Sequence, residues 1–368
     1  FNQSMINSQE LCSRKFVFDA NNILEDTFNQ IGKVFSMKEL KGPFYIEYKK
    51  NGEIEDGIDA GGLTKDWFTK FTQQVTDPSA KLFVQSETSQ NFSPIRTSAA
   101  TEKENLDKYR VTGIVIAKAL MNQIQIPVSF NTSFLKILLH HEEKIKMKDL
   151  EEYDPQIYNS LQLYANYDFT DDDDIRFEYT NSDCETVELM EGGKEIKVTN
   201  DNKMDYIDEI FNYVLKYSVQ KQSAAFCKGF ESFIKHNDIR IFSPVELNIL
   251  ICGIPEINID DLKQNVEFIH PFNAETKVVK LFFKAISKWD NEKLAKLLYF
   301  ITAIIRLPVD GFSYFKKIGN PITIAPGGDS NKFPCAHTCV NRLDLPEYEN
   351  EEQLVSKFIT AIECNNFD

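Results

Sequence analysis

The segment FPCAHTCVNRLDLPEY, residues 333–348, decides how the rest of the chain is interpreted. It places Cys339 among small and polar residues instead of in an apolar run. A cysteine reacts as its thiolate, which exposure and nearby hydrogen-bond donors or positive charges favour. Residues of this kind close to Cys339 are His337, Thr338, Asn341 and Arg342. Cys252 is the contrast within the chain, because it follows the apolar run 249–251, as is typical of a buried structural cysteine.

The composition predicts a large soluble protein. A chain of 368 residues exceeds what one hydrophobic core usually serves, so two or more packed units are expected. No apolar run reaches the length of a membrane span, and the amino end lacks the pattern of a signal peptide. Seven irregularly spaced cysteines make no disulfide framework and fit a reducing compartment, so we expect a cytosolic or nuclear protein. Because the chain begins at Phe1, we expect it to be part of something longer.

The net charge of −15 argues against a nucleic-acid surface. Such a surface needs clustered lysine and arginine side chains to neutralise phosphates. The charge favours basic protein partners only in a general way.

The apolar pattern predicts a mostly helical chain with a few short strands. Helical spacing of apolar residues is found in 16–40, 62–75, 104–124, 132–140, 154–166, 202–217, 218–236 and 244–252. Strand-like alternation or extended stretches are found in 44–48, 175–179, 186–189 and 196–198. Beyond a boundary near 268–273, we expect helices at 276–287, 290–305 and 351–363, with strands and loops over 321–343.

Several motifs in one order carry a family resemblance. The segment 336–348, which contains Cys339, resembles the active-site signature of HECT ubiquitin ligases. Other stretches similar to this family, in the family's order, are GIDAGGLTKDWF (57–68), GGKEIKVTNDNK (192–203), 222–230 and 242–253. The resemblance covers about 16–367, nearly the whole chain, and the four further motifs in the family's order argue against coincidence.

The resemblance implies an α+β, bilobal HECT-like fold. We expect a large, mostly helical N-lobe at 1–270, with a subdomain that binds a carrier enzyme at about 150–218. A hinge at 271–273 would join it to a smaller α/β C-lobe at 274–368, which bears Cys339. The residues that we assign to the hinge region are Ile269, His270 and Pro271. Because a proline restricts itself and the residue before it, we expect a stiff hinge.

The resemblance also implies the reaction. Ubiquitin passes from the thioester of a ubiquitin-conjugating enzyme to Cys339, and from there to a lysine of a protein substrate. His337 and Thr338 are supporting residues, and no metal or organic cofactor is implied. By position, the family's carrier-binding residues correspond to Ile157, Leu161, Tyr167, Ile175, Tyr206 and Ile210. Without the resemblance, the helical spacing of these apolar residues favours ordinary core.

Three alternatives remain open at the level of the sequence. Cys335, His337 and Cys339 form a weak zinc pattern, since structural zinc usually takes four ligands in two closely spaced pairs. A cysteine protease would need a distant histidine and an oxyanion hole. The candidate histidines are His140, His141, His236 and His270. A scaffold that binds ubiquitin or the carrier without transfer is the third alternative, against which the intact cysteine segment argues.

The segment 302–312 departs from the family pattern T-G-x-x-R-x-P-x-G-G-F. Ala303 and Asp310 stand where the pattern has glycine. If either position requires a positive φ, aspartate tolerates it better than alanine does.

Overall fold

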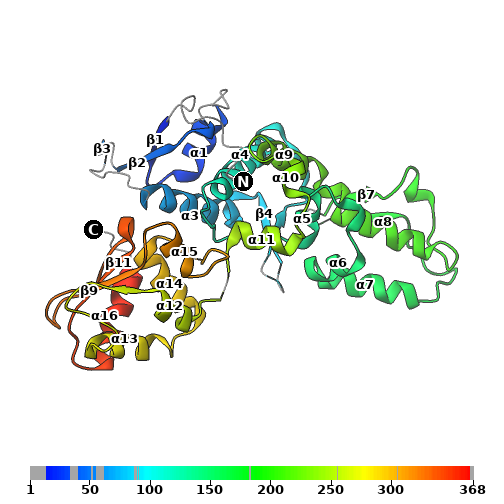
Figure 1. Cartoon of the computed structure of the whole chain (residues 1–368). Coiled ribbons are helices and arrows are strands. Elements are labelled where there is room, and N and C mark those ends of the chain that lie inside the picture. The colour runs from blue at the N-terminus through cyan, green and yellow to red at the C-terminus, as the bar shows by residue number, and fades with distance from the viewer. Residues whose placement is uncertain are drawn as a thin grey trace.

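The chain is a mixed α+β protein in which helices predominate and the sheets are small. The computed structural model describes residues 14–33, 40–50, 53–54, 62–86, 89, 91–181, 184–254, 256–304 and 306–364. Over these residues, buried apolar side chains form three clusters, named here the central, lateral and C-terminal cores. In Figure 1 the C-terminal elements form a body at the lower left, and the lateral elements lie at the opposite end of the molecule.

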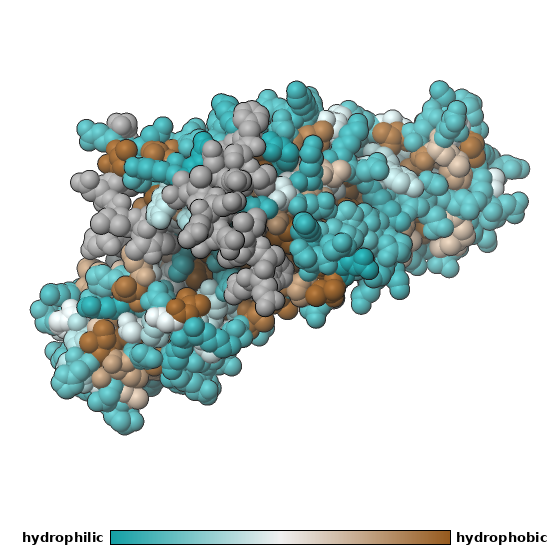
Figure 2. All heavy atoms as spheres, turned by 45° about the horizontal axis from the view of Figure 1, so that its top comes forward, coloured by the Kyte–Doolittle hydropathy of each residue, from teal (hydrophilic) through white to brown (hydrophobic). Residues whose placement is uncertain are grey.

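The described residues include no helix long and apolar enough to span a bilayer. Figure 2 shows that the face in view is mainly hydrophilic, with apolar residues in small separate patches, in keeping with the high charge of the chain.

A small sheet opens the described part of the chain. Strand β1 (Arg14–Asp19) runs parallel to β2 (Phe44–Lys50), and the two-residue β3 (Glu53–Ile54) pairs antiparallel with β2. The prediction of a strand at 44–48 is confirmed. Helix α1 (Ile23–Gly32) follows β1.

The prediction of a helix from residue 16 is wrong at its start. Phe16 and Phe18 are buried on alternate positions of β1, which is the two-residue period of a strand. Of the apolar positions that we assigned to one helix, Phe16 therefore lies on β1, whereas Ile23, Leu24, Phe28 and Ile31 lie on α1. The expected positions at 34 and 35, and 57–61 of the second motif, lie outside the described residues.

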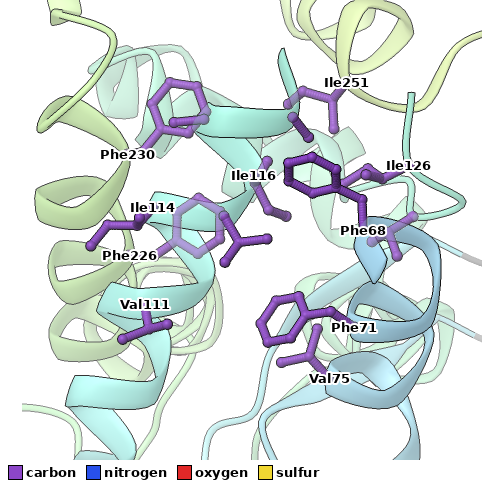
Figure 3. Close-up of a cluster of buried hydrophobic side chains, with 14 of the residues drawn as sticks. Phe68, Phe71, Val75, Val111, Ile114, Ile116, Ile126, Phe226, Phe230 and Ile251 are labelled. Carbon is purple, nitrogen blue, oxygen red and sulfur yellow. The ribbon is translucent and has the colours of Figure 1, made fainter. Parts of the chain in front are cut away.

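The central core is built mainly from four helices, each of which the apolar spacing predicts. They are α3 (Gly62–Thr76), α4 (Lys103–Met121), α9 (Gln220–Glu231) and α11 (Pro244–Cys252). Figure 3 shows phenylalanines of α3 and α9 pointing toward the isoleucines of α4. Around them lie β4 (Phe83–Gln85), β5 (Phe92–Pro94), α5 (Thr132–Leu138) and α10 (His236–Ile239).

Two glycines allow α4 and α9 to pack backbone against backbone. A β-carbon at Gly113 would lie 2.1 Å from the carbonyl oxygen of Phe226, and one at Gly229 would lie 1.9 Å from that of Arg110. No larger residue fits at either position without separating the helices.

The lateral core lies between α6 (Met147–Tyr153), α7 (Pro155–Asn166) and α8 (Lys203–Leu215). The side chain of Asp154 caps α7 by accepting a hydrogen bond from the Ile157 amide, and Pro155 occupies the first turn. The short strands β6 (Glu178–Thr180) and β7 (Thr186–Glu188) complete the unit, whereas the strand expected at 196–198 is only a single bridge.

The C-terminal core packs helices against a four-stranded sheet. The strand order is β10-β11-β9-β8, with β10 antiparallel to β11 and the other neighbours parallel. The strands are β8 (Glu267–Phe268), β9 (Thr323–Pro326), β10 (Cys335–His337) and β11 (Arg342–Leu345). The helices are α12 (Ile259–Asn265), α13 (Lys277–Ile286), α14 (Asn291–Thr302), α15 (Ser313–Lys317) and α16 (Glu351–Cys364).

The C-terminal core begins before residue 270, the position at which we expect the two lobes to divide. Leu262 of α12 is buried in the C-terminal core, and β8 is a strand of its sheet. The expected hinge lies inside this unit: the Ile269 amide donates to the Ile324 carbonyl oxygen at 2.9 Å, and Phe272 is buried. The expected hinge residues His270 and Pro271 lie between Ile269 and Phe272, and therefore belong to a turn of one packed unit.

The chain passes from the central unit to the C-terminal unit near Gly253, directly after α11. Ile251 is the last residue of the central core, and Leu262 is the first buried residue of the C-terminal core. Gly253 has a φ of 74°, and a β-carbon there would lie 2.2 Å from the Leu307 carbonyl oxygen. Only glycine fits this combination of backbone angle and close approach.

Candidate active site

Cys339 lies in the tight connection between β10 and β11. A single 3₁₀ turn, Thr338–Val340, links the two strands. Both Cys339 and Val340 are exposed on this turn. The sheet thus presents the thiol at its edge, whereas Cys252 is buried at the end of α11, as its apolar surroundings predict.

Two asparagines hold the turn in place. Asn341 is fully buried, has a φ of 48°, and donates from Nδ2 to the Asn320 carbonyl oxygen at 2.8 Å. Asn320 in turn donates from Nδ2 to the Cys339 carbonyl oxygen at 3.2 Å. Asparagine tolerates the left-handed backbone region better than most residues. The sequence indicated Asn341 as a neighbour of the thiol, but its amide binds main chain beneath the turn.

His337 is directed along the sheet toward an ion pair. Its Nε2 lies 3.1 Å from Asp344 Oδ2, and Arg342 donates from Nε to Asp344 Oδ1 at 2.6 Å. His337 and Arg342 are opposite each other in the β10–β11 register, so the three side chains share one face. This arrangement orients the imidazole through Asp344, and an acid–base role for His337 stays a prediction.

Thr338 and Cys339 lie against the first turn of α3, a helix of the central unit. A β-carbon placed on Gly62 would be 3.4 Å from Thr338 Oγ1 and 3.7 Å from Cys339 Sγ. Lys65, one turn further along α3, is half-buried and interacts electrostatically with Cys339. The sequence reasoning missed Lys65, although its place in the second motif, next to residues already singled out, was a usable signal.

A second contact joins α3 to the C-terminal unit. Tyr299 of α14 donates from its hydroxyl to Asp66 Oδ1 at 2.8 Å, and the other Asp66 oxygen pairs with Lys70 Nζ at 2.7 Å. Burial and the Asp66 carboxylate raise the pKa of Tyr299, so its hydroxyl stays protonated and remains a donor. The two units therefore meet along one face of α3.

Three of the six expected carrier-binding residues are core residues. Leu161, Tyr206 and Ile210 are buried in the lateral core, and Tyr206 is only 5% exposed. The ring of Tyr206 packs on those of Tyr164 and Phe177, and burial raises its pKa to about 12. These three residues lie on the inward faces of α7 and α8, and their role in carrier binding stays a prediction.

The remaining expected residues lie nearer the surface. Tyr167 is exposed, whereas Ile157 and Ile175 are half-buried. Two exposed apolar residues that the sequence reasoning missed lie on the same elements: Leu163 on α7 is 72% exposed and Met204 on α8 is 55% exposed. Both fall outside the buried stripe of their helix, which was the available signal.

The other histidines lie away from Cys339. His140 follows α5 and contacts Glu231 and His236, in the unit around the central core (Figure 1). His270 follows β8, at the opposite edge of the sheet from β10. The structure therefore supplies none of the separate histidines that a cysteine-protease arrangement needs beside the thiol. In the described part of the chain, no three His, Cys, Asp or Glu side chains are grouped to hold a metal ion.

Comparison with known proteins defines the class of this fold and site. The HECT-domain (ubiquitin-transferase) family matches residues 69–368, so the chain belongs to this family. It is 32% identical over 353 residues to E3 ubiquitin-protein ligase UPL1 of Arabidopsis thaliana, covering 92% of this chain and 9% of that protein. It is 33% identical over 347 residues to E3 ubiquitin-protein ligase NEDD4 of Homo sapiens, covering 93% of this chain and 26% of that protein.

A third relative is also an E3 ubiquitin-protein ligase and has a similar identity to this chain. E3 ubiquitin-protein ligase TOM1-like of Neurospora crassa is 36% identical over 340 residues, covering 86% of this chain and 8% of that protein. The chain thus spans between about a tenth and a quarter of the length of these three relatives.

Proposed function

We propose that this chain is a catalytic domain of an E3 ubiquitin ligase, and that Cys339 carries ubiquitin as a thioester. The observation that supports the nucleophile best is the exposed 3₁₀ turn, which presents Cys339 while asparagines fix the main chain beneath it. Family membership supplies the reaction class.

The chemistry has two acyl transfers. The Cys339 thiolate attacks the thioester carbonyl of the charged ubiquitin-conjugating enzyme, and the carrier's sulfur leaves as its thiolate. A substrate lysine amine then attacks the new thioester, and the Cys339 sulfur leaves. The first exchange replaces one thioester by another, so positioning is the main requirement on the protein.

Such a reaction needs Cys339 to face two partners in turn. We propose a bilobal arrangement in which the central and lateral cores form one lobe and the C-terminal core forms the other. The lobes would pivot near Gly253, where the chain passes from the central core to the C-terminal core, and not at 271–273. Such a movement would let Cys339 leave α3 and approach a carrier bound at the lateral core.

We place the carrier-binding surface on the outer side of α7 and α8. Leu163, Tyr167 and Met204 supply exposed apolar area there. Lys203 donates from Nζ to the Tyr167 carbonyl oxygen at 2.7 Å, which ties the end of α7 to the start of α8. Ile157 and Ile175 stay as flanking candidates, and a protein substrate remains an expected partner.

A charging assay with a Cys339→Ser variant tests the proposal. The chain is incubated with charged carrier enzyme, and ubiquitin adducts are separated with and without reductant. The wild type should form a thiol-labile adduct, while the serine variant forms at most a reductant-stable ester, because an alkoxide is far less available than a thiolate near neutral pH. A thiol-labile adduct that persists in Cys339→Ala would show that the nucleophile is another residue.

A further inference from the structure

The first turn of α3 forms a wall of the Cys339 site that comes from the other unit. The thiol lies at the amino end of this 15-residue helix, 3.7 Å from where a β-carbon on Gly62 would be. A β-carbon at Gly62 would be in ordinary van der Waals contact with the Thr338 and Cys339 side chains, so their turn lies directly against the helix. The amino end of a helix carries partial positive charge, which favours negative charge placed there.

Lys65 adds a full positive charge to the same wall. It is three residues after Gly62, so the two positions share one face of α3. Burial lowers the pKa of Lys65, while a charged Cys339 sulfur raises it. The ammonium is therefore partly desolvated, and water screens its interaction with the exposed Cys339 sulfur less than it would between two fully exposed groups.

We propose that Lys65 promotes the transfer of ubiquitin to a lysine, by stabilising the negative charge that collects on Cys339 Sγ as the thioester breaks. This inference rests on the proposed function. The neutral acceptor amine attacks the thioester carbonyl carbon, and a C–N bond forms. The C–S bond breaks with its electron pair on Sγ, and the surplus proton of the amine passes to water. Sγ thus leaves as a thiolate beside Lys65 and the α3 amino end.

The proposal makes Lys65 specific to one of the two steps. Cys339 meets Lys65 only when the C-terminal unit lies against α3, as it does in this structure. While Cys339 is loaded by a carrier bound at the lateral core, it is away from α3 and Lys65 has no charge to stabilise. Removing Lys65 should therefore slow discharge and leave loading unchanged.

Single-turnover discharge of the charged chain to free lysine tests the proposal. The variants are Lys65→Gln, Lys65→Arg and, as a matched loss of one positive charge, Lys263→Gln. Lys263 is on α12, where it is exposed and pairs with Asp260. We expect Lys65→Gln to discharge about tenfold more slowly than wild type at low ionic strength. Lys65→Arg and Lys263→Gln should stay within about twofold of wild type, and added salt should narrow the Lys65→Gln difference.

Other results would overturn the proposal. Discharge of Lys65→Gln at the wild-type rate would do so, as would equal losses of loading and discharge that arginine does not rescue. If Lys65→Gln melts at a lower temperature than wild type, Lys65→Met takes its place in the assay, because methionine keeps the aliphatic stem of the lysine. Early melting of both variants would show that Lys65 has a structural role instead. A wild-type chain that never forms a thioester on Cys339 would instead refute the proposed function, which is a separate result.

Discussion

Two residues with positive φ set the backbone around the candidate active site, and their side chains suit that role unequally. Asn341 holds the turn after Cys339, and its amide gains a hydrogen bond to Asn320 in return. Ala303 ends α14 with a φ of 56° and gains nothing comparable, because its side chain is a methyl group buried in the C-terminal unit. The sequence left open whether the two positions at which the family pattern has glycine, 303 and 310, require a positive φ. In the structure Ala303 has a positive φ and Asp310 does not.

Ala303→Gly should therefore stabilise the protein. Glycine adopts the left-handed region without steric strain, although it also raises the conformational entropy of the unfolded chain. The net increase in the free energy of unfolding is about 1 kcal/mol. Urea unfolding of the C-terminal unit measures it. Ala295→Gly, in the interior of the same helix, is the control and should destabilise by about 1 kcal/mol. If both substitutions destabilise, strain at Ala303 is not significant.

At the scale of elements, helix periodicity predicted which side chains of α8 are buried. The buried residues of α8 include Tyr206, Ile207, Ile210 and Phe211, which is the stripe that apolar spacing predicts. The resemblance implies that Tyr206 and Ile210 also bind the carrier, which stays a prediction, and in the structure both side chains are buried. Position in an alignment does not say which way a side chain points, whereas a 3.6-residue period does.

Leu163→Asp and Tyr206→Ala should separate binding from stability. Leu163 is exposed, so Leu163→Asp should change the free energy of unfolding by less than about 0.5 kcal/mol. The same variant should load Cys339 about fivefold or more slowly, because an apolar anchor at an interface is worth more than about 1 kcal/mol. Tyr206→Ala should instead destabilise by about 3 kcal/mol, because it empties a site between two aromatic rings.

Thermal melting and loading per folded molecule are the measurements for this pair. Asn166→Asp, at the end of α7 on an exposed position, adds the same charge and controls for electrostatic repulsion of the carrier. Normal loading by Leu163→Asp would place the carrier elsewhere on the molecule.

At the scale of the whole molecule, the sequence predicted the long helices and the exposed thiol but misplaced the junction between the units. Helices such as α3 and α14 have enough residues for the period of their apolar side chains to predict a helix. Strand β8 has only two residues, too few for any period, although it joins 267–268 to the C-terminal sheet. Pro271 suggested a linker because proline often lies outside regular elements, yet it occupies a turn within one packed unit. The contacts across α3 join residues more than 200 positions apart, and local sequence carries no signal for them.

The hydrogen bond between Tyr299 and Asp66 should hold the C-terminal unit in the orientation that favours discharge. Tyr299→Phe keeps the ring and removes only the donor to a buried carboxylate. A hydrogen bond to a charged group is worth about 1.5–3 kcal/mol, so the docked arrangement should become at least about tenfold less populated. Discharge to free lysine should slow accordingly, while loading by the carrier is unchanged or faster.

Tyr314→Phe is the matched control, because the Tyr314 hydroxyl also crosses between the units but reaches the Gln123 carbonyl oxygen only at 3.5 Å. A bond of that length to a neutral acceptor contributes little, so this variant should discharge nearly as fast as wild type. Loading is measured with the free chain and charged carrier enzyme, and discharge is measured in single turnover on the charged chain. If Tyr299→Phe slows loading as much as discharge, the contact supports the fold in general. If it changes neither rate, the arrangement in which Cys339 lies against α3 is not the one from which ubiquitin is transferred.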